Sequence, residues 1–216
     1  MYTPRANVES DISTLRQFVR ENPLCALITG TLHGLVASHI PVVLHEEGAG
    51  FGTLRGHVAR ANSQWQVFDT KAEALAIFTG PQHYISASWF PGKKVHGKET
   101  PTWNYVAVHI YGRLRCIEDS DWLLEHLTTL TDSNEMTMEV PWKVSDAPRD
   151  FIVKKFRGIV GLEMEVSRVE GKWNVNQSRN KEDAHGVMAG LERLATPAGE
   201  TMSNLIRTRR SDLSTK

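Results

Sequence analysis

The segment Thr102-Trp-Asn-Tyr-Val-Ala-Val-His-Ile-Tyr-Gly-Arg-Leu-Arg-Cys-Ile117 carries the clearest strand pattern in this sequence of 216 residues. Aliphatic side chains and a cysteine recur at even positions, whereas aromatic and basic side chains recur at odd positions from Trp103 to Arg115. Since successive side chains of a strand point to opposite faces, this period of two predicts a strand with one face in a core. A straight strand of this length would span roughly 50 Å, so we expect a bend near Gly112.

Further strands are predicted on both sides of this segment, over residues 24–29, 35–44, 51–55, 74–78, 84–90 and 159–169. Helices are predicted over residues 10–20, 119–131, 148–156 and 183–194, a short helix or loop over 57–65, and a loop over 93–100. Pro41 lacks a donor and predicts an edge, bulge or kink in its strand. Gly80-Pro81 is expected to end the strand at 74–78.

The predicted strands do not alternate regularly with helices. About six or seven strands in this order favour a mainly β fold with peripheral helices (α+β), in which a mostly antiparallel barrel is decorated by helices, over a doubly wound sheet. The length is compatible with one domain over residues 1–195, followed by a polar C-terminal tail over 196–216 that is either helical or frayed.

Composition narrows the possible partners. Lys and Arg together number 25, as do Asp and Glu, so DNA binding would have to depend on a local patch. No apolar run is long enough to span a membrane, and no signal peptide is apparent at the start. The two cysteines, Cys25 and Cys116, lie in apolar strand-like segments, which favours a reducing, cytoplasmic location.

A cluster of anion-binding residue types lies between residues 53 and 62. The sequence contains neither a P-loop nor a dinucleotide-binding glycine motif. Phosphate can instead be held by arginine, histidine, threonine and backbone donors at a strand end, and such a set is formed by Thr53, Arg55, His57, Arg60 and Asn62. The alternative is a solvated basic turn.

Histidines and aromatic residues leave further alternatives open. The spacing of the histidines does not match a known metal motif, so no metal site is predicted. Large aromatic side chains with a polar atom can stack on a flat ligand or fill a subunit interface, and the candidates are Tyr84, Trp89, Trp103 and Tyr105.

Several motifs together resemble the PaiB-type FMN-binding negative transcriptional regulators, a family similar to the flavin split-barrel group that includes pyridoxamine phosphate oxidase. The most specific strings are His57-Val-Ala-Arg-Ala-Asn62 and Pro101-Thr-Trp-Asn-Tyr105. Other matching segments are Met1-Tyr-Thr-Pro4, Ala37-Ser-His-Ile-Pro41, Ile77-Phe-Thr-Gly-Pro81, Tyr84-Ile-Ser86 and, more weakly, Asn176-Gln-Ser-Arg-Asn180.

The resemblance implies an antiparallel split β-barrel homodimer that binds FMN at the subunit interface. Arg55, His57, Arg60 and Asn62, with Thr53 beside them, would hold the phosphate and ribityl chain. The remaining implied flavin ligands are Ser38, His39, Trp103, Asn104, Gln177 and Arg179.

The biochemical role stays open between three alternatives. The family name implies a regulator with DNA as a partner, although no helix-turn-helix motif is apparent in the sequence. A flavin-dependent oxidoreductase, similar to a flavin reductase, is the second alternative, and no catalytic residue is assigned for it. The third is a barrel that binds haem through His39, His57 or His109.

Overall fold

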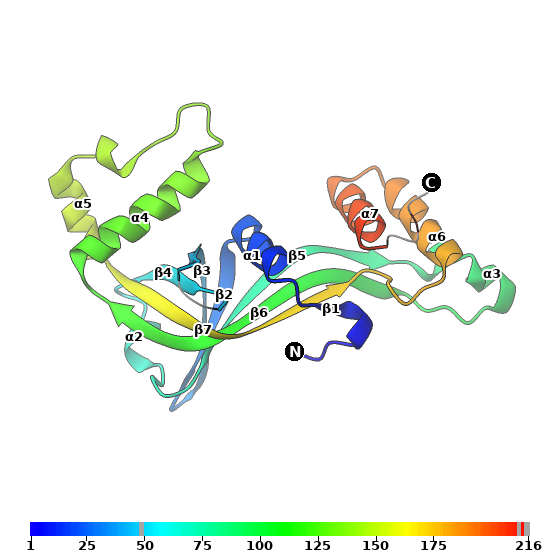
Figure 1. Ribbon diagram of the computed structural model, residues 1–216, viewed down its shortest axis with the longest axis horizontal. Helices are drawn as coiled ribbons and strands as arrows, with labels where there is room; N and C mark the ends of the chain where they lie inside the picture. The colour runs from blue at the N-terminus through cyan, green and yellow to red at the C-terminus, as the bar shows by residue number, and fades with distance from the viewer. Residues whose placement is uncertain (48–49, 211–212, 214–216) are drawn as a thin grey trace. The chain divides into compact units, whose positions relative to one another are not determined.

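The computed structural model describes residues 1–47, 50–210 and 213. Its seven-stranded, mainly antiparallel sheet has the order β1-β7-β4-β3-β2-β5-β6, and an additional pairing of β7 with β6 closes six of these strands into a barrel (Figure 1). The strands are β1 (Val8–Glu9), β2 (Leu24–Thr31), β3 (Gly34–His45), β4 (Thr53–Ala59), β5 (Ala74–Ile85), β6 (Thr102–Ile117) and β7 (Ile159–Asn174).

Helices precede, connect and follow the strands along the chain. The α-helices are α1 (Ile12–Glu21), α2 (Gln64–Val67), α3 (Gly92–His96), α4 (Ser120–Glu135), α5 (Arg149–Phe156), α6 (Lys181–Glu192) and α7 (Pro197–Arg209). Short 3₁₀ helices are η1 (Arg5–Asn7), η2 (Ala87–Trp89) and η3 (Val144–Asp146). The predicted fold class, an antiparallel barrel with peripheral helices, is therefore confirmed.

The chain forms two compact units. The barrel unit comprises residues 12–78 and 109–169, and the second unit comprises residues 1–11, 79–108 and 170–216. Strands β5, β6 and β7 each contribute residues to both units. The predicted domain limits, 1–195 and 196–216, remain a prediction.

The interior of the barrel unit is apolar and tightly filled. Cys25, Phe78, Ile110 and Val160 are completely buried. A cavity among the interior side chains measures only about 10 Å³, the size of one water molecule. Such dense packing of side chains from every barrel strand gives the scaffold its rigidity.

Strand β6 has the limits predicted from the sequence, and its burial alternates as expected. In the barrel unit Ile110 and Leu114 are buried, whereas Arg113 and Arg115 are exposed. Gly112 lies so close to β7 that an added Cβ would overlap the Glu165 carbonyl oxygen. This position therefore requires glycine because of backbone approach.

Pro41 lies where β3 changes its pairing partner. Residues from Gly34 to Pro41 pair with β2, and residues from Val42 to His45 pair with β4. Pro41 has no backbone N–H and therefore needs no acceptor. The N–H of the next residue, Val42, donates to the Pro23 carbonyl at 2.9 Å. Strand β3 is continuous from Gly34 to His45, so Pro41 marks a change of pairing partner within the strand.

Four local predictions were wrong, including the strand over 84–90, where β5 ends at Ile85 and η2 follows. Strand β5 continues through Pro81 to Ile85 instead of ending at Gly80, because a strand tolerates proline where no neighbouring carbonyl needs its nitrogen. Strand β4 includes His57 and ends at Ala59, so only Gln64–Val67 is helical in the segment predicted as a helix or loop. The predicted loop over 93–100 contains α3.

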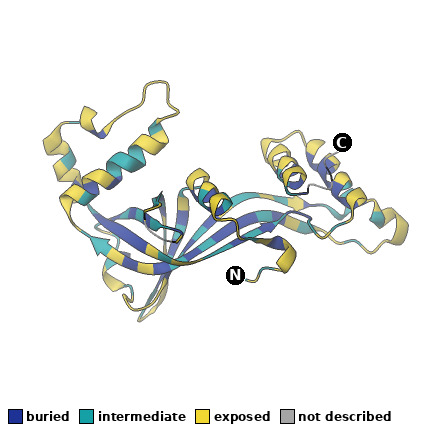
Figure 2. Cartoon of the chain, in the orientation of Figure 1, coloured by how far each residue is buried: buried dark blue, intermediate teal, exposed yellow. Residues whose placement is uncertain are grey.

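The second unit has its own core around α6 and α7. Val187, Leu191, Met202 and Ile206 are completely buried, and Figure 2 shows buried positions along both helices. The segment after residue 196 is thus helical, one of the two predicted alternatives. Leu194, the last residue of the predicted helix over 183–194, is 45% exposed because α6 ends at Glu192.

Candidate functional site

The outer face of β4 presents three of the predicted anion-binding side chains. Thr53, Arg55 and His57 alternate with Leu54 and Val58, which are buried in the barrel. This alternation follows from the period of two in a strand. The polar side chains of Arg55 and His57 meet helix α4, which belongs to the connection between β6 and β7.

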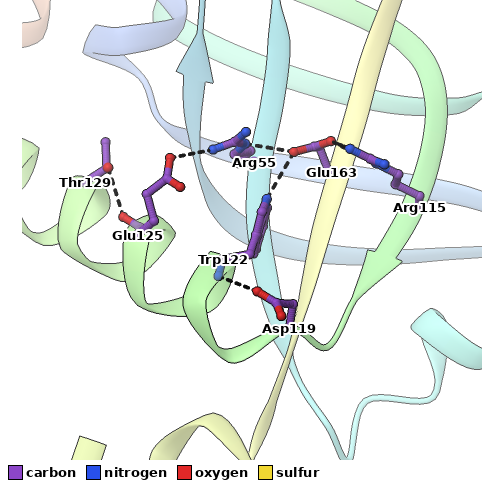
Figure 3. Close-up of polar contacts among 7 residues, drawn as sticks. All are labelled: Arg55, Arg115, Asp119, Trp122, Glu125, Thr129 and Glu163. Carbon is purple, nitrogen blue, oxygen red and sulfur yellow. Dashed lines mark hydrogen bonds and ion pairs between the residues drawn. The ribbon is translucent and has the colours of Figure 1, made fainter. Parts of the chain in front are cut away.

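Arg55 takes part in an ionic network centred on the buried Glu163 of β7 (Figure 3). The Arg55 Nε donates to Glu163 Oε2 at 2.8 Å, and an Arg55 terminal nitrogen donates to Glu125 at 3.0 Å. Glu163, only 6% exposed, also accepts bonds from Arg115 Nε at 2.8 Å and Trp122 Nε1 at 3.2 Å. Two carboxylates therefore already balance the charge of Arg55.

Glu163 is ionised in this environment. Burial alone would raise the pKa of its carboxyl group, but hydrogen bonds from Arg115, Trp122 and Arg55 outweigh burial and lower the pKa below its ordinary value. The network thus joins β4, β6, β7 and α4 through one negative charge.

His57 belongs to a second polar contact beneath α4. Its Nδ1 lies 3.1 Å from Nε2 of His126, a completely buried residue whose ring stacks on Trp122 at 5.3 Å. Burial, followed by the nearby His57, His45 and Arg55, lowers the pKa of His126 to about 3. Burial also lowers the pKa of His57. Both rings are consequently neutral near pH 7.

The described residues contain no group of three histidine, cysteine or acidic side chains that could hold a metal ion. His126 Nδ1 and His45 Nε2 are buried and have no hydrogen-bond partner within the described part of the chain. We therefore interpret the histidines beneath α4 as a neutral packing contact.

Acidification should destabilise this contact. Unfolded His126 would bind a proton near its ordinary pKa of 6.5, whereas the folded residue resists protonation down to about 3. The unfolded state thus binds more protons in this window, and stability falls as the pH drops below 6.5, by on the order of 2 kcal/mol at pH 5. Urea unfolding of His126→Phe should show a shallower pH dependence. An unchanged slope, or an equal effect of the exposed-site control His33→Phe, would contradict this assignment.

Arg60 is held by several partners within the barrel unit. Its Nε donates to the Arg157 carbonyl at 2.9 Å, and its terminal nitrogens donate to the Ile159 carbonyl at 3.1 Å and to Glu118 at 2.6 Å. The guanidinium also lies 5.6 Å from the ring centroid of Trp65. Phosphate binding by Arg60 would require an exchange of these partners.

The structure brings Asn62 and Ser38 together. The Asn62 side-chain nitrogen donates to the Ser38 hydroxyl at 2.8 Å, and the Asn62 side-chain oxygen accepts a bond from the backbone N–H of Gln64 at 3.0 Å. Ser38 pairs with the buried Leu27 across the hairpin, so it points toward the interior side of the sheet. His39 points to the opposite, outer face and is exposed.

The other predicted ligands lie in the second unit. Trp103 is 53% exposed, and its ring meets Tyr84 edge-on at 6.1 Å. Gln177 bonds the backbone of Trp173 and Val175 and so stabilises its own turn. Arg179 pairs with Glu99 at 2.6 Å, and its guanidinium lies over the ring of Phe90 at 4.5 Å.

Asn104 differs from these residues. It is 1% exposed, yet neither its amide nitrogen nor its oxygen has a hydrogen-bond partner within the described residues. Leaving a buried polar group unpaired costs about 1–3 kcal/mol, so such groups call for an explanation. An external ligand that supplies both a donor and an acceptor would satisfy this amide.

Sequence reasoning missed Glu163, Trp122 and His126. The only available signal was the spacing of Trp122 and His126, which places both on one face of the predicted helix. Their partners on β4 and β7 are distant in the sequence, so their convergence depends on the folded barrel.

The closed antiparallel barrel with peripheral helices has the architecture of a split barrel. A family described as "Putative FMN-binding domain" matches residues 1–168, and the chain belongs to this family. FMN is accordingly the cofactor that the family assignment supports.

Relatives match over nearly the whole chain. An uncharacterized protein of Emericella nidulans, AN0679, is 32% identical, with 97% of each chain covered. "Protease synthase and sporulation protein PAI 2" of Bacillus subtilis is 29% identical, with 95% of this chain and 96% of the relative covered. The flavocytochrome Anf3 of Azotobacter vinelandii matches in fold at a TM-score of 0.56 and 11% identity, covering 80% of this chain and 72% of that one.

Proposed function

We propose that the protein functions as an FMN-binding homodimer, with the flavin held at the subunit interface. The observation that carries this proposal is Asn104, whose buried amide has a donor and an acceptor unused. The uracil-like edge of a flavin ring offers carbonyl and N–H groups in the complementary arrangement. Bound FMN would supply electron transfer through its ring system.

The ligand set can be refined by unused hydrogen-bonding capacity. Ser38, His39 and Thr53 in the barrel unit, and Trp103 and Asn104 in the second unit, carry polar atoms that their protein contacts leave available. We propose Trp103 and Asn104 as FMN ligands of the second unit, and Ser38, His39 and Thr53 as candidate FMN ligands of the barrel unit.

The other six predicted ligands already have protein partners, and we propose them as positioning residues for the flavin. They are Arg55, His57, Arg60, Asn62, Gln177 and Arg179. An arginine that already bonds to a carboxylate offers phosphate less net attraction than an unpaired one. Direct phosphate binding by Arg55 or Arg60 would therefore depend on release of Glu163, Glu125 or Glu118.

An apolar sheet face supports the homodimer. Leu24 is 59% and Leu35 is 80% exposed on the outer side of the β2–β3 hairpin. Ile28 and the exposed Ala37 are paired across the same face. Exposed apolar surface of this kind favours association. A second copy of the chain is the proposed partner.

Leu35→Glu tests the dimer and the flavin site together. A charge on this exposed face should leave the protomer folded but shift the dimer to monomer in sedimentation velocity, because a buried unpaired carboxylate is costly. We expect FMN affinity to fall by about tenfold or more. Val95→Glu, a comparable change at a position that is 85% exposed in α3, is the control. A dimeric Leu35→Glu variant would contradict this interface, and a colourless wild type that takes up no FMN would contradict the function.

Three measurements separate the possible roles. Bleaching of bound FMN by NADH or NADPH would assign an oxidoreductase, and salt-sensitive retention of promoter DNA over random DNA would assign a regulator. A haem absorption spectrum of the isolated protein would assign a haem-binding barrel. Two arginines of α7 that could contact DNA already have acidic partners: Arg207 pairs with Glu192, and Arg209 pairs with Glu9.

A further inference from the structure

A cavity of about 600 Å³ lies within the barrel unit between α4, η3 and α5. These elements form the connection from β6 to β7, and Figure 1 shows α4 and α5 joined by a long irregular segment. None of the proposed FMN ligands lines this cavity. Its volume falls within the range of about 300–1,000 Å³ that is usual for small-molecule sites.

The floor of the cavity is apolar. Three apolar side chains line it. Val144 is buried and Ile152 is half-buried, whereas Leu124 keeps 42% of its surface exposed. Figure 2 shows exposed positions along α4 and α5. Filling this space with an apolar group would remove the exposed surface of Leu124 from water, which is favourable.

The rim carries two cations and one anion. Lys143 and Arg149 line the cavity together with Asp132. Within residues 1–47, 50–210 and 213, no ion pair involves any of these three side chains. Their formal sum is one positive charge, which complements a monoanion better than a dianion such as phosphate.

Hydroxyl groups complete the rim. Thr128 and Ser145 line the cavity, and each can donate one hydrogen bond to a carboxylate oxygen. An arginine offers a planar pair of donors that matches a carboxylate.

We propose that this cavity binds a small apolar molecule bearing a single carboxylate, such as a medium-chain or aryl-substituted alkanoate. The apolar body occupies the floor formed by Leu124, Val144 and Ile152, and the carboxylate bonds to Arg149 and Lys143 at the rim. The site is independent of the proposed FMN function, because it lies on the helical connection and uses other residues.

Isothermal titration of the full-length protein with octanoate tests the proposal. We expect saturable binding at one site per chain, and an affinity for 1-octanol, which has the same chain length without the charge, that is at least tenfold weaker. Arg149→Glu should weaken octanoate binding by about tenfold or more. Lys154→Glu, the same charge reversal at an exposed position of α5 outside the cavity, should keep the affinity within about twofold.

Three results would overturn the proposal: no saturable octanoate binding, equal affinities for octanoate and octanol, or equal effects of Arg149→Glu and Lys154→Glu. Circular dichroism verifies folding of each variant. If Arg149→Glu does not fold, Lys143→Glu provides the same comparison from the exposed position on the other side of η3.

Discussion

Glu163→Gln is expected to lower the free energy of unfolding by about 3 kcal/mol, near the lower end of the cost of breaking a buried ion pair. The substitution keeps the size of the side chain and removes the charge that Arg55 and Arg115 share. Arg55 would retain Glu125, and the exposed Arg115 side chain can turn to water, so the loss should stay near that lower value. Thermal unfolding followed by circular dichroism should show a midpoint about 6–12 °C lower.

Glu165→Gln is the matched control for this prediction. It makes the same chemical change two residues along β7, on the same outer face but at an exposed position. Its midpoint should stay within about 2 °C of the wild type. Equal midpoints for the two variants would show that the Glu163 network does not stabilise the barrel.

The network also predicts a pH dependence. Because the pKa of Glu163 is lowered on folding, its contribution to stability is fully present above about 4.5 and is lost as the pH falls through the lower value of the folded protein. Glu163→Gln should remove this part of the acid dependence, since glutamine does not titrate.

The fold was predictable where one face of a strand meets a core. The limits of β6 and the burial of Ile110 and Leu114 followed from a period of two, a local property of the chain. Pro41 was predicted to mark an edge, bulge or kink because proline lacks a donor, and it lies where β3 changes its pairing partner.

The course of β5 was not predictable in the same way. Gly80 and Pro81 carry a turn signal in the sequence, but both lie within β5. Tertiary pairing overrides local preference here, and a single sequence does not indicate which backbone nitrogens of a strand need a partner.

The candidate site was likewise predictable only in part. The residue types around Arg55 and Arg60 correctly indicated polar chemistry, but their acidic partners Glu163 and Glu118 are 108 and 58 positions away in the sequence. Such pairs depend on the order of strands in the barrel. The unpaired amide of Asn104 likewise became visible only once every neighbouring donor and acceptor had been placed.

Asn104→Leu is expected to weaken FMN binding by about 5- to 150-fold, the equivalent of the 1–3 kcal/mol associated with a buried hydrogen-bonding group. Leucine has a similar size and carries no polar atoms. In the flavin-free protein the substitution removes an amide that is buried without partners, so the thermal midpoint should stay constant or rise. A fluorescence titration with FMN and a thermal scan without it measure the two effects separately.

Asn7→Leu should give the opposite result. Asn7 lies in the same unit, is 9% exposed, and donates to the Asn174 side-chain oxygen at 2.7 Å. Its replacement leaves that oxygen without its donor, which should lower the midpoint of the flavin-free protein while FMN affinity is retained. If Asn104→Leu instead destabilised the flavin-free protein and kept its FMN affinity, Asn104 would be a structural residue. If the hydrogen-bond partners of Asn104 arrive with FMN, replacing Asn104 lowers the affinity for FMN without lowering the stability of the flavin-free protein.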